Sequence, residues 1–85
     1  MANHDKTLRD VFEKPTRSDI AWRDIESLFR HRGATITQGK GSRVRIALGG
    51  VKAVFHRPHP KKEASKGCVE SVRVFLENAG VHPDV

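Results

Sequence analysis

The hydrophobic pattern of this 85-residue chain changes its period twice, and this change limits the folds that the chain can adopt. Apolar and polar residues alternate along 43–48 and 51–56, and Gly49-Gly50 lies between the two stretches. This pattern predicts two strands joined by a two-residue hairpin. Residues 34–38 predict another short strand, followed by a turn at 39–42. We therefore expect the middle of the chain to form a three-stranded antiparallel meander.

Helical periodicity lies on both sides of this meander. Residues 22–32 predict a helix that Ser18 or Asp19 caps and Gly33 ends. The apolar stripe of that helix consists of Trp22, Ile25, Leu28 and Phe29. A second helix is expected from Gly67 to Ala79, and a short helical arm over 6–14, which Pro15 ends.

This order of elements predicts an α+β fold, α-β-β-β-α, with two helices on one face of the sheet and a short N-terminal helical arm. We expect residues 1–19 to form the arm and its linker, and residues 20–85 to form the domain. The uncovered face of the sheet is then polar and basic. It would display Thr35, Thr37, Arg43, Arg45 and Lys52.

The composition excludes several classes of protein. No apolar run approaches the roughly 18 residues that a membrane span needs, and the N-terminus has no apolar stretch typical of a secretory signal. A single cysteine, Cys68, rules out an internal disulfide and a cysteine-built zinc site. We expect a cytoplasmic protein that needs no cofactor.

Positive charge is concentrated in the middle of the chain. Residues 30–66 hold ten Lys and Arg against the single acid Glu63, whereas the net charge is −1 over residues 1–29 and −2 over 67–85. Such a local field attracts a polyanion, mainly through release of its counterions. A solvated, solubilising surface is the alternative, but the concentration of charge favours nucleic acid.

Two segments carry residue types suited to a phosphate backbone. In Lys40-Gly41-Ser42-Arg43, glycine allows a close backbone approach, and the three side chains can donate hydrogen bonds to phosphate oxygens. An ordinary glycine-containing hairpin turn explains the same pattern equally well.

The segment from His56 to Glu63 places two histidines, His56 and His59, among cations. Histidine exchanges protons near pH 7, and a neighbouring Arg57 or Lys61 can stabilise charge on a reacting phosphate. Surface histidines without a catalytic role are nevertheless more common. We expect no metal site, because no third ligand of a suitable type lies near the two histidines.

The aromatic side chains are expected in the core rather than on the surface. Trp22 and Phe29 lie on the apolar stripe of a helix, and Phe55 lies on the core side of its strand. No exposed aromatic residue is then left for stacking on bases, which argues against single-strand binders of the RNP or OB type.

These segments, in this order, resemble the HicA toxins, which are small endoribonucleases of type II toxin–antitoxin systems. The resemblance runs from about Trp22 to Val81. It rests on Lys40-Gly41-Ser42, on His59-Pro60-Lys61-Lys62-Glu63 with Lys66-Gly67, and on Ala79-Gly80-Val81. It implies a fold like that of double-stranded-RNA-binding domains, cleavage of mRNA, and inhibition by a HicB-like antitoxin protein.

One position departs from the family pattern. HicA toxins usually carry their catalytic histidine directly after Gly-Ser, where this chain has Arg43. Arginine stays protonated in proteins and cannot act as a general base. We therefore expect His59 or His56 to transfer protons, or the protein to bind RNA without cutting it. The expected RNA contacts are Lys40, Ser42, Arg43, Arg45, Lys61 and Lys62.

Two further readings of the sequence remain. One is a non-catalytic RNA-binding module on the same fold. The other, a DNA-binding or interaction domain, is weaker because no helix is basic enough along one face to enter a major groove.

Overall fold

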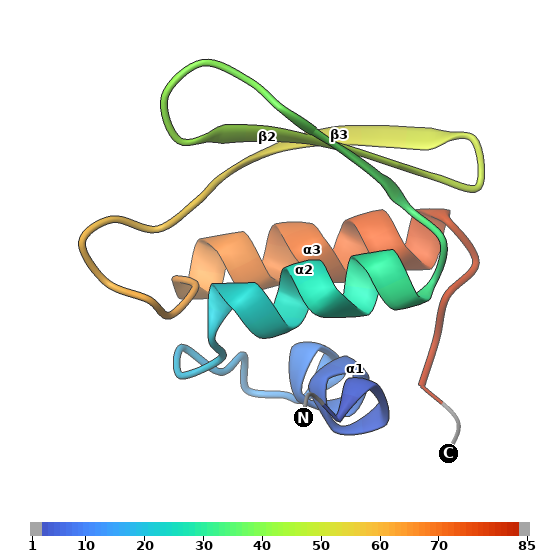
Figure 1. Ribbon diagram of the computed structural model, residues 1–85. Coiled ribbons are helices and arrows are strands. Elements are labelled where there is room, and N and C mark those ends of the chain that lie inside the picture. Colours follow the sequence, from blue (N-terminus) through green and yellow to red (C-terminus); the bar gives the residue numbers. More distant parts are fainter. Residues whose placement is uncertain (1–2, 84–85) are drawn as a thin grey trace.

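The protein is built in three layers: a sheet, a pair of helices beneath it, and one short helix beneath the pair (Figure 1). The structure, a computed structural model, describes residues 3–83. The sheet contains β1 (Thr35–Gln38), β2 (Arg43–Leu48) and β3 (Val51–His56), antiparallel in the order β1-β2-β3. Helices α2 (Trp22–His31) and α3 (Lys66–Asn78) cover one face, and α1 (His4–Phe12) packs below them. The predicted α+β fold of the double-stranded-RNA-binding-domain type is confirmed.

The apolar sides of the sheet and of the two central helices meet in one core. Four aromatic rings fill its centre, with neighbouring ring centroids 5.6–6.4 Å apart: Trp22, Phe29, Phe55 and Phe75. From the sheet, Val44 and Ile46 point into the same core and are almost fully buried. The aromatic residues expected in the core therefore lie there.

Helix α2 ends as expected but begins differently. Gly33 follows it with φ +86°, the left-handed conformation that ends helices. Neither Ser18 nor Asp19 caps its start. The N-cap residue is Ala21, whose side chain makes no capping bond, and the N–H of Trp22 donates to the carbonyl of Lys62 at 2.9 Å. The predicted cap was wrong because a distant loop supplies the acceptor that the helix start needs.

The N-terminal arm is packed against the helical layer. Leu8 and Val11 of α1 are buried, and Arg73 of α3 donates to the carbonyl of Val11 at 3.0 Å and to the Thr16 hydroxyl at 2.9 Å. The helix covers residues 4–12 instead of 6–14, because the Asn3 side chain accepts from the N–H of Lys6 and starts it earlier. The side of the helical layer away from the sheet is therefore covered.

Candidate nucleic-acid interface

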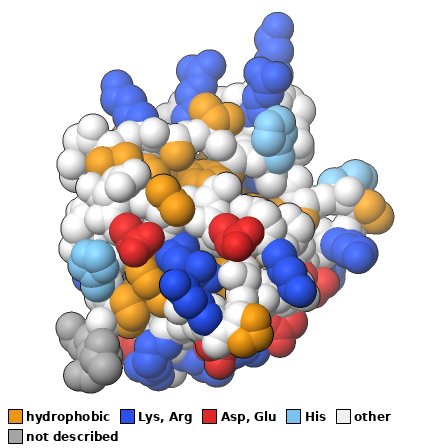
Figure 2. All heavy atoms as spheres, turned by 180° about the vertical axis from the view of Figure 1, so that it is seen from behind, with side chains coloured by type: hydrophobic (Ala, Val, Ile, Leu, Met, Phe, Trp, Pro, Cys, Tyr) orange, Lys and Arg blue, Asp and Glu red, His pale blue; other side chains and the backbone are white. Residues whose placement is uncertain are grey.

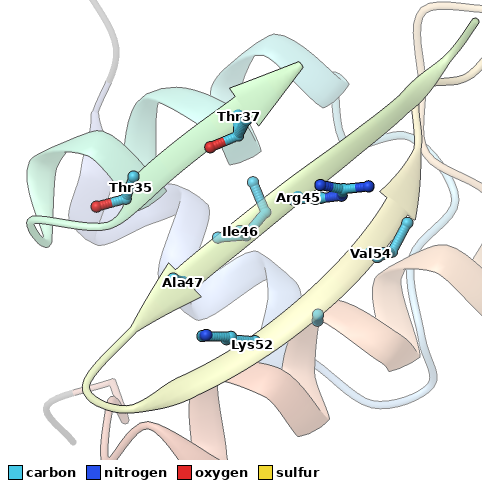
Figure 3. A pocket seen from close by; sticks show the side chains of 8 residues that line it. Thr35, Thr37, Arg45, Ile46, Ala47, Lys52 and Val54 are labelled. Carbon is cyan, nitrogen blue, oxygen red and sulfur yellow. The ribbon is translucent and has the colours of Figure 1, made fainter. Parts of the chain in front are cut away.

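The outer face of the sheet presents three rows of side chains, because residues paired across antiparallel strands point to the same side. The first row is Thr35, Ala47 and Lys52; the second is Thr37, Arg45 and Val54; the third is Arg43 and His56. The first two rows line an open hollow (Figure 3). None of these eight residues is acidic. The polar, basic outer face expected from the alternating pattern is confirmed.

Among the described residues, positive charge on the sheet side of the molecule has no acidic side chains around it. Figure 2 shows Lys and Arg side chains projecting from the top, which is the sheet side, while the acidic side chains visible in this view lie lower, among further Lys and Arg side chains. Six cations on and beside the sheet are exposed, and none of them forms an ion pair within residues 3–83. They are Lys40, Arg43, Arg45, Lys52, Lys61 and Lys62. Their charges are therefore available to a ligand.

The turn between β1 and β2 leaves main-chain donors unused. The N–H of Gly39 donates to the Arg43 carbonyl at 3.0 Å, and the N–H of Arg43 to the Lys40 carbonyl at 3.1 Å. Within residues 3–83, the three N–H groups between them, at residues 40–42, have no partner. Gly41 adopts φ +60°, a left-handed conformation that is strained for any residue with an L side chain. Consecutive free N–H groups in a turn form a concavity that suits an anion.

The two motifs predicted separately from the sequence lie side by side. The N–H of Arg57 donates to the Ser42 carbonyl at 2.8 Å, and His56 is the cross-strand partner of Arg43. Both loops leave the same end of the sheet, at the left of Figure 1. The turn 39–42 and the start of the loop 57–65 therefore adjoin at one end of the sheet, and the rest of the loop leads down to the start of α2.

The histidines lie near this junction. His56 and His59 are exposed and line one open hollow, together with Lys61 and Lys66. Within residues 3–83, the only histidine whose side chain has a hydrogen-bond partner is His4, which lies in α1. His56 and His59 thus have access to solvent, but no hydrogen bond from the described part of the chain orients either ring.

Main-chain hydrogen bonds hold the basic end of the loop 57–65. Besides the bond from Trp22 to the Lys62 carbonyl, the N–H of Ala64 donates to the Ile20 carbonyl at 2.9 Å. Ala21 and Glu63 form an isolated antiparallel bridge. The exposed Lys61 and Lys62 are therefore carried by a backbone that is fixed to the start of α2.

Arg57 does not serve as the free cation that the sequence suggested. Its guanidinium binds the Glu26 carboxylate at 2.7 and 3.1 Å, and Glu26 is buried. This pairing, with a further hydrogen bond from Trp22, holds the pKa of Glu26 below its ordinary value although burial opposes the shift. Sequence reasoning missed Glu26. The spacing of four residues from Glu26 to both Trp22 and Arg30 was the available signal.

No helix within residues 3–83 has both the length and the apolarity to cross a membrane. Over the same residues, no group of three His, Cys, Asp or Glu side chains is arranged to hold a metal ion.

Comparison with known proteins places this arrangement in a family context. Residues 22–81 match the model of the family described as HicA toxin of bacterial toxin-antitoxin. The match covers well over half of the chain, begins at the first residue of α2 and ends just after α3. No curated protein and no solved structure matches the chain.

Proposed function

We propose, from the premise that this chain belongs to the HicA toxin family, that it binds mRNA through its outer sheet face and cleaves it as a metal-independent endoribonuclease. Family membership makes the protein a toxin of a toxin–antitoxin system and implies an antitoxin partner. In this proposal residues 20–85 carry the RNA-binding surface, and the protein acts in the cytoplasm.

The observation that carries the proposal is the set of six exposed cations without acidic partners among residues 3–83. Lys40, Arg43, Arg45 and Lys52 lie on the outer sheet face or its turn, beside the free N–H groups of residues 40–42, and Lys61 and Lys62 lie on the loop that leads from the sheet to the start of α2. All of these groups are hydrogen-bond donors suited to phosphate, and phosphate contacts provide most of the affinity of sequence-independent binding. Lys40, Ser42, Arg43, Arg45, Lys61 and Lys62 are the proposed contacts, and the position of Lys52 on the same face adds it to them.

For cleavage, a histidine accepts the proton of a ribose 2′-hydroxyl while the 2′-oxygen bonds to phosphorus. The bond from phosphorus to the 5′-oxygen breaks, and an acid returns a proton to that oxygen. His56 and His59 are the proposed proton carriers. Arg43 on β2 is paired with His56 on the neighbouring strand β3. Its permanent positive charge suits it to stabilise the negative charge that develops on the phosphate.

A specific observation favours a second candidate, an RNA-binding module without nuclease activity. The rings of His56 and His59 have no hydrogen-bond partner within residues 3–83, whereas catalytic histidines are usually held in place by a third group. Arg43 occupies the position in which the family usually carries its catalytic histidine.

We further propose a HicB-like antitoxin as the partner of this chain. The charge of the outer sheet face suits an antitoxin that covers it with acidic side chains. Such an antitoxin would occupy the surface that binds RNA.

Induced expression tests the proposed nuclease activity. Wild-type protein should arrest growth and degrade mRNA, and either His56→Ala or His59→Ala should abolish both effects while the protein stays folded. His82→Ala is the matched control, because His82 is exposed and lies outside the proposed interface. Intact mRNA under the wild-type protein, with RNA bound by the purified protein, would establish the binding module instead.

RNA binding is tested separately by the salt dependence of its affinity. If all six cations contact phosphates of a single strand, log K should fall against log salt with a slope of roughly −4, and each single Ala variant should reduce the slope by about 0.7. A slope near zero, or binding that Arg45→Ala and Lys52→Ala leave unchanged, would remove the outer sheet face from the proposal.

A further inference from the structure

We propose that Gln38, Arg57 and Glu26 are positioning residues that hold the turn 39–42 in place beside His56. The inference rests on the proposed function, since it explains how the RNA-binding groups of that turn are kept in one arrangement. None of the three residues is itself a proposed RNA contact. Their effect is exerted through the main chain of the turn.

Gln38 is the residue in direct contact with the turn. Its side-chain amide donates to the carbonyl of Gly41 at 3.2 Å and, more weakly, to that of Gly39 at 3.4 Å. Two carbonyls of the turn are therefore occupied by one exposed side chain. The N–H groups of residues 40–42 stay free for an anion.

Arg57 reaches the same turn by two routes. Its main-chain N–H donates to the Ser42 carbonyl, and its guanidinium donates to the Oε1 atom of Gln38. Because Arg57 directly follows His56, these bonds fix the turn relative to that histidine. One residue thus joins the β1–β2 turn to the loop that carries the proposed proton carriers.

Glu26 joins Arg57 to the buried side of α2. Its carboxylate lies on α2 and accepts hydrogen bonds from both Arg57 and Trp22. Its neighbours Ile25, Leu28 and Phe29 have no measurable exposure. The contacts therefore form a series from Glu26 on α2, through the Arg57 guanidinium and the Gln38 side-chain amide, to the main chain of the turn.

The chemical reason for such a chain of contacts is preorganisation. A glycine-containing turn without side-chain support samples many conformations, and ordering it upon binding opposes association. A turn that is already held presents its N–H groups and the Lys40 and Ser42 side chains in one geometry. Removing the support should weaken RNA binding without removing any group that contacts phosphate.

Gln38→Ala and Arg57→Lys test the proposal in the full-length protein. Nitrogen-15 relaxation should show increased fast motion of the backbone at residues 40–42 in both variants without RNA. Affinity for a single-stranded RNA oligonucleotide should fall about tenfold, while the slope of log K against log salt stays unchanged. The unchanged slope separates a positioning residue from a phosphate contact.

Two matched controls separate positioning from general stability. Asn78→Ala removes an exposed amide outside the proposed interface, and Arg73→Lys weakens a guanidinium that joins α3 to α1 on the covered side of the helical layer. Both should leave the motion of the turn and the RNA affinity unchanged, although Arg73→Lys should lower the melting temperature. An Arg73→Lys variant that loses as much affinity as Arg57→Lys would overturn the proposal.

The relaxation measurement also keeps this inference distinct from the proposed function. If the wild-type protein binds no RNA, the proposed function fails, yet the motion of residues 40–42 still decides whether Gln38 and Arg57 hold the turn. Order parameters at those residues that are the same in wild type and in Gln38→Ala would overturn the inference whatever the RNA result.

Discussion

The contacts of Glu26 predict a large and pH-dependent cost for the Glu26→Gln substitution. The side chain is 8% exposed and accepts two charge-assisted hydrogen bonds from Arg57, a longer one from Arg30 at 3.3 Å, and one from Trp22. Glutamine keeps the shape but loses the charge, and its amide nitrogen faces a donor. Removing one partner of a buried pair costs about 3–5 kcal/mol. Arg57 is 32% exposed and regains water, so we expect a smaller loss of about 2–3 kcal/mol, within the range for hydrogen bonds to charged groups.

Chemical denaturation at pH 7, followed by the fluorescence of the single Trp22 and by circular dichroism, measures this loss. In thermal unfolding it corresponds to a decrease of about 10–20 °C for a domain of this size. Glu70→Gln is the matched control, because Glu70 is exposed and forms no ion pair within residues 3–83. It should change the free energy of unfolding by less than about 0.5 kcal/mol.

The sign of the pH dependence follows from the lowered pKa of Glu26, whose main cause is the hydrogen bond from Arg57. A carboxylate whose pKa is lower in the folded state stabilises the fold above its unfolded pKa, near 4.3. That stability is lost as the pH falls through the folded value. The difference between wild type and Glu26→Gln should therefore be full at pH 7 and shrink below about pH 4. An equal difference at pH 7 and pH 3, or one below 0.5 kcal/mol at pH 7, would refute this reasoning.

Three further predictions concern other parts of the fold. Leu8→Ala in the buried face of α1 should cost about 2–5 kcal/mol in urea denaturation, and a loss below 1 kcal/mol would mean that α1 contributes little to the core. Gly41→Ala should destabilise the fold by about 1–2 kcal/mol because φ is +60°. Gly67→Ala, in the first turn of α3 with no atom within 4 Å of the added Cβ, should instead stabilise the fold by about 0.5–1 kcal/mol. Melting temperatures that shift by the same amount and in the same direction in the two glycine variants would contradict both predictions. Burial raises the pKa of the Cys68 thiol, so alkylation by iodoacetamide near pH 8 should be slower in the folded protein than in urea; equal rates would show that the thiol is freely accessible.

Most of the fold could be predicted because its periodicity is local. Alternation along β2 and β3 places every second side chain on one face, and Gly49-Gly50 specifies the hairpin. The start of α2 could not be predicted in this way. Its first N–H is satisfied by the carbonyl of Lys62, forty residues later in the chain, and no local pattern indicates that partner.

The candidate site was predictable in its parts but not in their connections. The segments around Ser42 and His59 could be identified by residue type, whereas their contact through the Arg57 N–H depends on strand register. Arg57 was predicted as a free cation because its partner, too, is distant in the sequence. Its carboxylate partner lies 31 residues away on a helix, and a basic residue within a basic segment looks free until the fold brings Glu26 to it.

The layered arrangement also distributes net charge unequally between the sheet side and the helical side of the molecule. Residues 35–65, which form the sheet and its two end loops, carry a net charge of +6, while residues 1–34 and 66–85, which form the arm and the two central helices, carry +1 and −1. Sheet and helices lie on opposite sides of a small body, so this separation amounts to a dipole across it. A polyanion approaching through solution at low salt should rotate the protein before touching it and meet the sheet side first. Most collisions would then begin with the proposed RNA-binding face toward the polyanion, and added salt should slow association more than it speeds dissociation.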